Sequence, residues 1–325
     1  MTAETNAVVL CIALNPAIDL TIGVPHLVPG EVNRAERAQQ DAGGKAINVA
    51  SCLADHDIKV AVSGQLGRNN PALFEALFKA KGIDNHCLYI DGNTRLNTKL
   101  VDPAQGMTTD INLPGPLQTA ADIEAQRIRL TEILERLLPT LHWVVLSGSL
   151  PPGWPTDTYA TLIRQIHAQG VKVLLDTSGA ALREALEARP EIIKPNREEL
   201  AECLGCKLDS PASIVNAARR LLAAHPGMTL VVVSMGHEGA LFVTPEQVIT
   251  ALPLPIEPIS SVGAGDAMVA GVIAAQLAAF PLPQSAQLAT AFAAGKLTRL
   301  GAHLPARDVV QRLAEQVRLK TENHF

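Results

Sequence analysis

Short apolar segments rich in β-branched residues alternate with longer segments of helical periodicity, and this alternation constrains the fold more than any other feature of the chain. The segments of strand length are residues 7–14, 58–62, 143–146, 171–175, 192–193 and 230–233. Apolar residues at helical spacing recur between and after them, in residues 121–138, 158–169, 211–224 and 267–279. Such alternation is typical of a parallel sheet with helices on both faces. We therefore expect a doubly wound, mostly parallel α/β fold.

Two regions, residues 19–39 and 88–113, interrupt the alternation. Both are polar and turn-rich, and they contain short strand-like pieces such as residues 98–101 and 109–113. Neither region has enough apolar residues to form a core of its own. We expect them to pair into a small sheet that covers the end of the large sheet where ligands of open α/β folds bind. The chain is thus expected to form one domain over residues 1–325, with a discontinuous β lid.

Composition excludes several kinds of partner. The chain has 325 residues, of which 47% are hydrophobic and 18% charged, as in a globular protein with a substantial core. A net charge of −5, with only 2 Trp, 2 Tyr and 6 Phe, does not suit a nucleic-acid-binding surface. No basic leader and no apolar run of about 18 residues is present, so we expect no membrane partner and a cytoplasmic location.

The five cysteines do not form a recognisable framework. An odd number in a chain of this size does not suit a set of disulfides. Cys203 and Cys206 have the spacing of a metal or redox pair, but no second Cys or His pair accompanies them. We expect them to pack at a helix end.

The segment Gly263-Ala264-Gly265-Asp266 precedes a run of small and apolar residues that predicts a helix. Glycines at a helix start let an anion approach the free backbone N–H groups, and the helix dipole stabilises its charge. Asp266 would stand beside that anion site, although an acidic residue at a helix start is also an ordinary cap. A dinucleotide-binding fingerprint needs a third glycine where Met268 stands, so this segment does not fit one.

A second glycine pair, Gly43-Gly44, opens another small-residue helix in which Lys45 and Asn48 lie one turn apart. Both side chains could face a ligand, or the glycines could serve only a tight turn against the sheet. A Walker P-loop is excluded because Ala46 follows Lys45 where that motif requires Ser or Thr.

Polar residues follow two further strand-like runs. Asn196 and Glu199 have the spacing of a capping box at a helix start, and the alternative is a nucleotide-bound Mg²⁺ held through water. Ser147 begins the segment Ser147-Gly148-Ser149, which could be a turn or a place where backbone and hydroxyl meet a sugar. The nine histidines show no metal-ligand spacing, and no Gly-x-Ser-x-Gly elbow is present.

Taken together, Gly43-Gly44-Lys45-x-x-Asn48 and Gly263-Ala-Gly-Asp266 resemble the two signatures of the ribokinase-like carbohydrate kinases, the PfkB family. Further similarity lies in residues 14–19, 94–97, 147–151, 194–196 and 234–236, so that the resemblance covers nearly the whole chain. Many ribokinase relatives have Asp-Thr ahead of the final signature, whereas this chain has Ser260-Ser261. Serine at the first of these two positions is similar to the phosphofructokinase branch of the family.

The resemblance implies a role for each matching residue. Asp266 would be the general base, and the amides of Gly263, Ala264 and Gly265 would hold the γ-phosphoryl group. The positions implied for the sugar phosphate are Asp19, Gly43, Gly44, Lys45, Asn48, Arg95 and Ser147, with Lys45 and Arg95 as the cations that bind its phosphate. The positions implied for ATP are Lys194, Asn196, Glu199, Ser234, Gly236, Ser261 and Val262. Asn196 and Glu199 would also hold Mg²⁺ through water.

The resemblance further implies ATP-dependent phosphorylation of a ketohexose phosphate, with D-fructose 1-phosphate as the expected acceptor and a homodimer formed through the lid. Fructose 6-phosphate and tagatose 6-phosphate remain alternative acceptors within the family. A catalytically silent sugar-phosphate-binding protein is the alternative from another class.

Overall fold

The computed structural model describes residues 7–259 and 263–322. Its large sheet has the strand order β14 (Leu319–Glu322), β13 (Val248–Ala251), β12 (Ala240–Val243), β11 (Leu230–Ser234), β10 (Ile192–Ile193), β9 (Lys172–Asp176), β8 (Trp143–Ser147), β1 (Val9–Ala13), β4 (Val60–Gly67) and β5 (Asp84–Ile90). Seven neighbouring strands of this sheet are parallel, namely β5, β4, β1, β8, β9, β10 and β11. Each of the three strands at the β14 edge, β12, β13 and β14, is antiparallel to the strand before it. The predicted mostly parallel sheet is confirmed.

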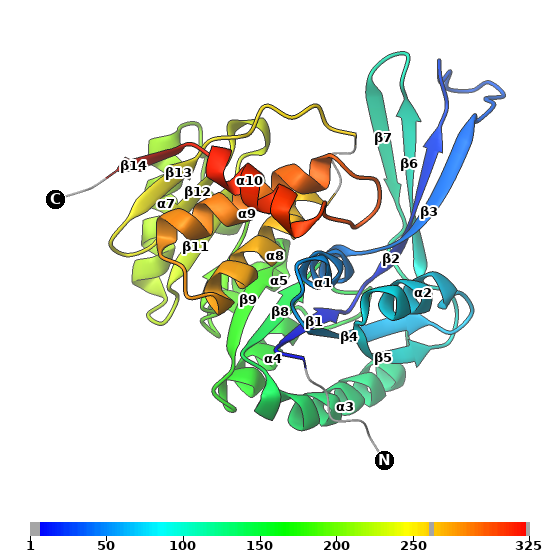
Figure 1. Ribbon diagram of the computed structural model, residues 1–325. Coiled ribbons are helices and arrows are strands. Elements are labelled where there is room, and N and C mark those ends of the chain that lie inside the picture. The colour runs from blue at the N-terminus through cyan, green and yellow to red at the C-terminus, as the bar shows by residue number, and fades with distance from the viewer. Residues whose placement is uncertain (1–6, 260–262, 323–325) are drawn as a thin grey trace.

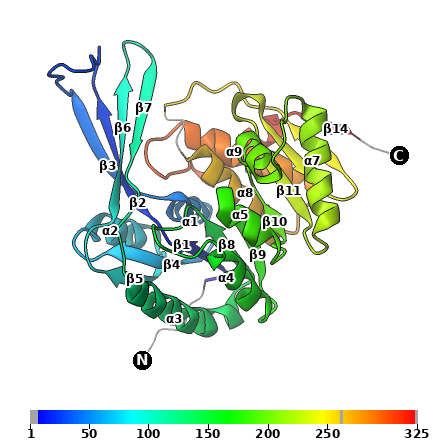
Figure 2. The same ribbon diagram turned by 180° about the vertical axis from the view of Figure 1, so that it is seen from behind.

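Helices cover both faces of this sheet (Figures 1 and 2). One face packs against α1 (Lys45–Asp55), α2 (Ala72–Lys81), α8 (Ala264–Leu277), α9 (Leu282–Leu297) and α10 (Arg307–Gln316). The other packs against α3 (Ala120–Leu137), α4 (Thr158–His167), α5 (Gly179–Leu186), α6 (Arg197–Leu204) and α7 (Pro211–Ala224). Alternate residues of one strand serve the two cores: Leu10 and Ile12 face one, Cys11 the other.

The expected helices lie where periodicity predicted them, and α7 has the predicted bounds. Helix α8 begins at Ala264, three residues earlier than expected. Gly263 precedes it with a φ of 79°, a left-handed conformation that glycine adopts without steric cost. Apolar residues lie all round α8, because it is buried between the sheet and α9. Periodicity therefore gives no sharp start for this helix.

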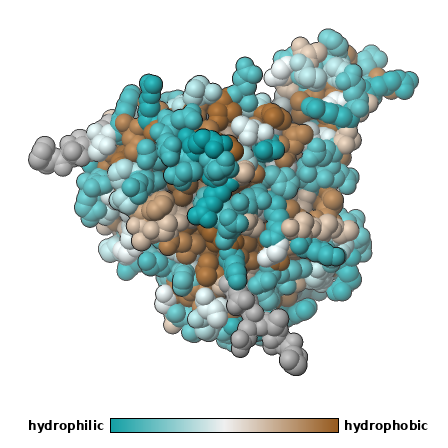
Figure 3. All heavy atoms as spheres, in the orientation of Figure 1, coloured by the Kyte–Doolittle hydropathy of each residue, from teal (hydrophilic) through white to brown (hydrophobic). Residues whose placement is uncertain are grey.

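A separate four-stranded sheet has the order β3 (Arg37–Gly43), β2 (Ala17–Gly23), β6 (Arg95–Asp102) and β7 (Met107–Asn112). It combines the two regions that interrupt the alternation, and it stands out from the body in the ribbon and surface views (Figures 1 and 3). Residues 88–90, expected in the lid, instead belong to β5 of the large sheet, because Leu88 is buried in the core and pairs with Gln65 of β4. At its other bound, β3 extends past residue 39 to Gly43.

Candidate active site

The carboxyl ends of the parallel strands bring polar side chains together at one edge of the large sheet. Ser147 ends β8, Asp176 ends β9, Ser234 ends β11, and Lys194 follows β10 directly. Helices α1 and α8 start beside this edge, and the small sheet rises from it (Figure 1). The fold therefore collects these residues where open α/β sheets bind ligands.

Asp266 lies in the first turn of α8 and is buried. Asn48 of α1 donates a hydrogen bond of 2.8 Å from Nδ2 to Asp266 Oδ2, which joins the two glycine-containing segments of the sequence. Burial, and then the negative charge of Asp176, raises the pKa of Asp266 to about 6. The Asp266 carboxylate is therefore a stronger base than an exposed carboxylate.

Asp176 is a central residue of the site that the sequence analysis missed. Its Oδ1 lies 3.2 Å from Lys194 Nζ and 3.5 Å from Lys45 Nζ, and Ser147 Oγ donates to its Oδ2 at 3.2 Å. Burial alone would raise the pKa of Asp176, but Lys194 and Lys45 outweigh burial and lower it. The available signal was a carboxylate directly after a buried apolar strand. The buried anion holds two of the predicted ligand residues, Lys45 and Lys194, in one cluster.

Gly43 lies beside Asp19 of β2. A Cβ at position 43 would overlap the Asp19 carboxylate and lie 3.2 Å from Ala17 O, so only glycine lets Asp19 reach the start of α1. Asn97 donates to Asp19 Oδ1 at 3.2 Å, and burial raises the pKa of Asp19. Gly44 precedes α1 with a φ of 99°. The glycine pair thus serves both a turn and a close approach of a polar side chain.

The Arg95 guanidinium already has hydrogen-bond partners within the protein. Its guanidinium donates to Asn15 O at 3.2 and 3.3 Å, to Asn97 Oδ1 at 2.9 Å and to Leu113 O at 2.9 Å. These contacts fasten β6 to the loop that follows β1. The role in binding phosphate that the resemblance implies for Arg95 stays a prediction.

The nucleotide side of the predicted site is partly described. Asn196 Oδ1 accepts from Glu199 N at 2.7 Å, and Glu199 Oε2 accepts from Asn196 N at 2.9 Å, so the predicted capping box is confirmed. The other carboxylate oxygen, Glu199 Oε1, lies 3.7 Å from Lys45 Nζ. Asn196 pairs with Ser234 in an isolated parallel bridge, and Gly236 follows at the start of a 3-10 turn. Ser261 and Val262 lie outside the described residues.

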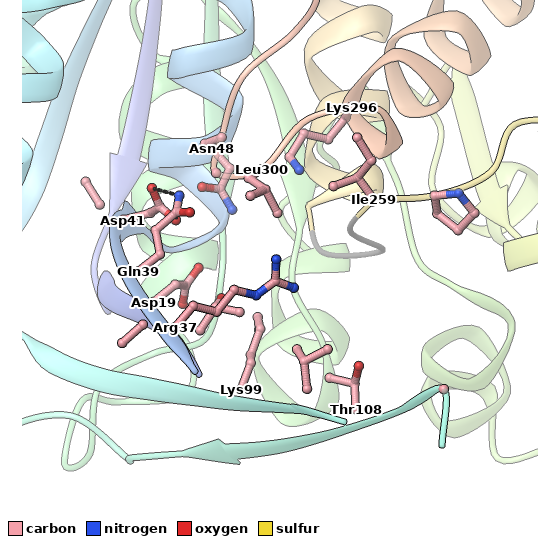
Figure 4. Close-up of a pocket in the computed structure, with 18 residues that line it drawn as sticks. Asp19, Arg37, Gln39, Asp41, Asn48, Lys99, Thr108, Ile259, Lys296 and Leu300 are labelled. Carbon is pink, nitrogen blue, oxygen red and sulfur yellow. Dashed lines mark hydrogen bonds between the residues drawn. The ribbon is translucent and has the colours of Figure 1, made fainter. Parts of the chain in front are cut away.

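A cavity of about 410 Å³ opens between the small sheet and the body (Figure 4). Asp19 and Asn48, both predicted sugar-binding residues, line it. Arg37 of β3, Lys99 of β6 and Lys296 of α9 also line it, and sequence reasoning missed all three. Arg37 passes over Gly23, where a Cβ would lie 2.8 Å from Arg37 Cγ. Single basic residues in polar strands or at a helix end give no signal that separates them from ordinary surface residues.

A buried carboxylate at a helix start, glycines at two helix starts and a lysine cluster at the carboxyl edge of the sheet define a class of site that transfers an anionic group to a hydroxyl. Comparison with known proteins gives the family. Residues 5–308 match the pfkB family carbohydrate kinase model, and the chain belongs to this family. It is an ATP-dependent sugar kinase, and the resemblance seen in the sequence is confirmed.

The similarity to known proteins extends over most of the chain. A 1-phosphofructokinase of Rhodobacter capsulatus is 46% identical over 95% of this chain and 96% of its own. A 1-phosphofructokinase of Xanthomonas campestris pv. campestris is 50% identical over 89% of this chain and 90% of its own. Among solved structures, phosphofructokinase-2 of Escherichia coli in complex with potassium has a TM-score of 0.85 at 26% identity, covering 95% of this chain and 98% of its own.

Two further findings concern membrane-spanning helices and metal-binding clusters. In residues 7–259 and 263–322, no helix combines the length and apolarity needed to cross a membrane. The same residues contain no group of three His, Cys, Asp or Glu side chains close enough together to hold a metal ion. Cys203 and Cys206 are free and pack against the core on the α6 side of the sheet.

Proposed function

We propose that the protein transfers the γ-phosphoryl group of ATP to the C6 hydroxyl of D-fructose 1-phosphate, giving ADP and fructose 1,6-bisphosphate. The curated relatives named 1-phosphofructokinase, which are 36–50% identical to this chain, support the choice of acceptor. The observation that carries the reaction type is the buried Asp266 at the start of α8, held by Asn48.

In this proposal Asp266 accepts the proton of the C6 hydroxyl as that oxygen attacks the γ-phosphorus. The bond from the γ-phosphorus to the β-phosphate oxygen breaks, and its electron pair leaves with ADP. The amides at the start of α8, from Gly263 to Gly265, face the negative charge of the transferring group. Asp19 and Asn48, which line the cavity, orient the sugar.

The nucleotide would extend along the carboxyl ends of β10 and β11, past Lys194, Ser234 and Gly236. MgATP is the expected donor, and Mg²⁺ would neutralise charge on the phosphates. Glu199 fits a water-mediated role, because Oε2 is held by the cap and Oε1 is turned toward Lys45. Asn196 is less suited to this role, since its Oδ1 already accepts the cap hydrogen bond.

An initial-rate panel tests the acceptor. Fructose 1-phosphate, fructose 6-phosphate and tagatose 6-phosphate would each be assayed with MgATP for ADP release, over a range of sugar concentrations. We expect the highest kcat/KM for fructose 1-phosphate. A higher value for either of the other two would move the protein to another branch of the family. Sugar-phosphate binding by calorimetry without any ADP formation would instead identify a silent binding protein.

We also propose a homodimer formed through the small sheet. Residues that pair across neighbouring strands lie on the same face of a sheet. Ile22 pairs with Leu100, and Thr98 pairs with both Leu20 and Ile111. The face opposite the cavity therefore carries four apolar residues, Leu20 and Ile22 of β2, Leu100 of β6 and Ile111 of β7. Ile111 is 51% exposed. Leu20, Ile22 and Leu100 are half-buried. A partly exposed apolar sheet face favours a second copy as its partner. The five free cysteines suit a reducing compartment, and we propose a cytoplasmic location.

A further inference from the structure

Lys296 is a buried lysine in the wall of the cavity. It lies in the last turn of α9 and is 2% exposed. Lysine is rarely buried to this degree unless a carboxylate pairs with it. Within the part of the chain that the structure describes, Nζ has no carboxylate at ion-pair distance and donates to Arg299 O at 3.1 Å. Figure 4 shows the ammonium end directed toward the cavity.

Lys81, a second nearly buried lysine, shows what a structural role looks like in this protein. Its Nζ lies 2.7 Å from Asp55 Oδ2 and 2.6 Å from Ser51 Oγ, and it also reaches Ala302 O at 3.3 Å. These contacts tie α1, α2 and the segment after α9 together. The charge of Lys81 is therefore neutralised within the fold, whereas Lys296 has a single neutral acceptor among the described residues.

The surroundings of Lys296 place it at the proposed transfer centre. A Cβ built on Gly263, the residue that precedes α8, would lie 3.4 Å from Lys296 Cε, 3.6 Å from Asn48 Nδ2 and 3.8 Å from Asp266 Oδ2. Three side chains from three helices therefore converge beside one helix start. The N-terminus of α8 carries partial positive charge, so a buried ammonium next to it is repelled as well as desolvated. Burial accordingly lowers the pKa of Lys296.

An anion bound at this position would relieve both costs. We propose that the Lys296 ammonium contacts the phosphoryl group as it passes from ATP to the sugar, and that it stabilises the charge on the phosphoryl oxygens. This inference rests on the proposed function and adds a catalytic residue to it. Lys296 stays protonated throughout: the proton of the hydroxyl goes to Asp266, and ADP leaves with the electron pair of the broken bond.

The test compares Lys296→Met with Lys81→Met. Methionine keeps most of the length of lysine and removes the charge, so it fits the same space without an ammonium. Turnover of fructose 1-phosphate with MgATP, separate binding of the sugar phosphate and of ATP by calorimetry, and thermal unfolding would be measured for both variants and the parent. The parent assay comes first, because a parent without kinase activity refutes the proposed function itself and not only the role of Lys296.

We expect Lys296→Met to lower kcat by about 10²- to 10³-fold, the range found when one group that stabilises transition-state charge is removed. Its Kd for fructose 1-phosphate should stay within about threefold of the parent, and its Tm should be unchanged or higher, because a buried unpaired charge is gone. Lys81→Met should show the reverse: a lower Tm, since Asp55 loses its partner, with kcat changed much less.

Binding of an ADP–aluminium fluoride complex in the presence of fructose 1-phosphate gives a second readout. This complex resembles the transferring phosphoryl group, so Lys296→Met should weaken its binding about as much as it lowers kcat. Three outcomes would overturn the inference: turnover near that of the parent, a loss confined to sugar-phosphate binding, or a fall in Tm like that of Lys81→Met. The last would assign Lys296 a structural role.

Discussion

At the scale of single residues, the site contains a carboxylate, Asp266, whose pKa is raised to about 6 by burial and by Asp176. A general base must be ionised to accept a proton, so activity should be lost as the pH falls through that value. We predict that log kcat/KM for fructose 1-phosphate falls by one unit per pH unit below about pH 6 and levels off above pH 7. The sugar phosphate itself titrates at about pH 6, so its pKa must be measured separately and each value of kcat/KM divided by the fraction of the sugar phosphate in its dianionic form. A corrected profile that stays flat down to pH 5 would contradict the assignment.

Gly43 gives a prediction about the sugar-binding side. In Gly43→Ala the new methyl group would overlap the Asp19 carboxylate and force it away from the start of α1. We expect kcat/KM for the sugar phosphate to fall by about 10- to 100-fold, because small misplacements of orienting groups are costly in catalysis. Gly82→Ala is the matched control: nothing lies within 4 Å of a Cβ at that position, and it should keep parent kinetics despite some loss of stability. Equal kinetics for both variants would remove Asp19 from the site.

Sequence reasoning found residues that carry a local pattern and missed those that do not. Gly43, Gly44 and the segment ending in Asp266 stand out because two closely spaced glycines at a helix start are unusual. Lys296 becomes recognisable only once the fold shows that it is buried, since a lone lysine is ordinarily at the surface. Asp176 had a signal, because it directly follows an apolar strand-like run, but its position between Lys45 and Lys194 depends on the fold. The capping box at Asn196 was predicted from its spacing, but nothing in that spacing could show that Glu199 also faces Lys45.

At the scale of elements, the parallel strands β1, β8, β9 and β11 were predicted, because their apolar runs are continuous in sequence. The buried strands β12 and β13 were missed, and each is only four residues long. The bounds of the small sheet were harder to predict, since its strands are polar on the cavity side and only a few of their residues, such as Ile18 and Ala42, reach the core. Residues 88–90 show the difficulty: they sit next to a polar region, yet Leu88 packs in the main core as part of β5. Only pairing with β4, a long-range contact, decides to which sheet they belong.

The Asp102 carboxylate, at the end of β6, connects two loop segments at the outer end of the small sheet. Its carboxylate accepts from the backbone N–H groups of His26 (3.0 Å), Leu27 (2.8 Å), Ala104 (3.0 Å) and Gln105 (3.2 Å). These hydrogen bonds lower the pKa of Asp102, although burial opposes them.

We predict that Asp102→Ala speeds hydrogen exchange at those four amides while the large sheet is unaffected. Asp91→Ala, which removes only an exposed ion pair with Arg68, is the control, and equal exchange in both variants would show that Asp102 does not organise this end.

At the scale of the whole molecule, the small sheet has two faces with different chemistry. One lines the cavity with Thr21, Arg37 and Lys99, and the other presents apolar residues. We predict that Leu100→Asp shifts the protein from dimer to monomer in light scattering, because a charge at the centre of the apolar face opposes association. Ile128→Asp places the same charge at an exposed apolar residue of α3 and should leave the dimer intact. A monomeric parent protein would refute the proposed dimer outright.

The central claim of this account is that one carboxylate at the start of α8 removes the proton of the attacking hydroxyl. Single-turnover phosphoryl transfer by Asp266→Asn, measured by rapid quench with the enzyme in excess over MgATP and with fructose 1-phosphate saturating, tests it most directly. We predict a rate about 10²- to 10⁴-fold below that of the parent with sugar-phosphate affinity largely kept. Transfer at nearly the parent rate would contradict the claim.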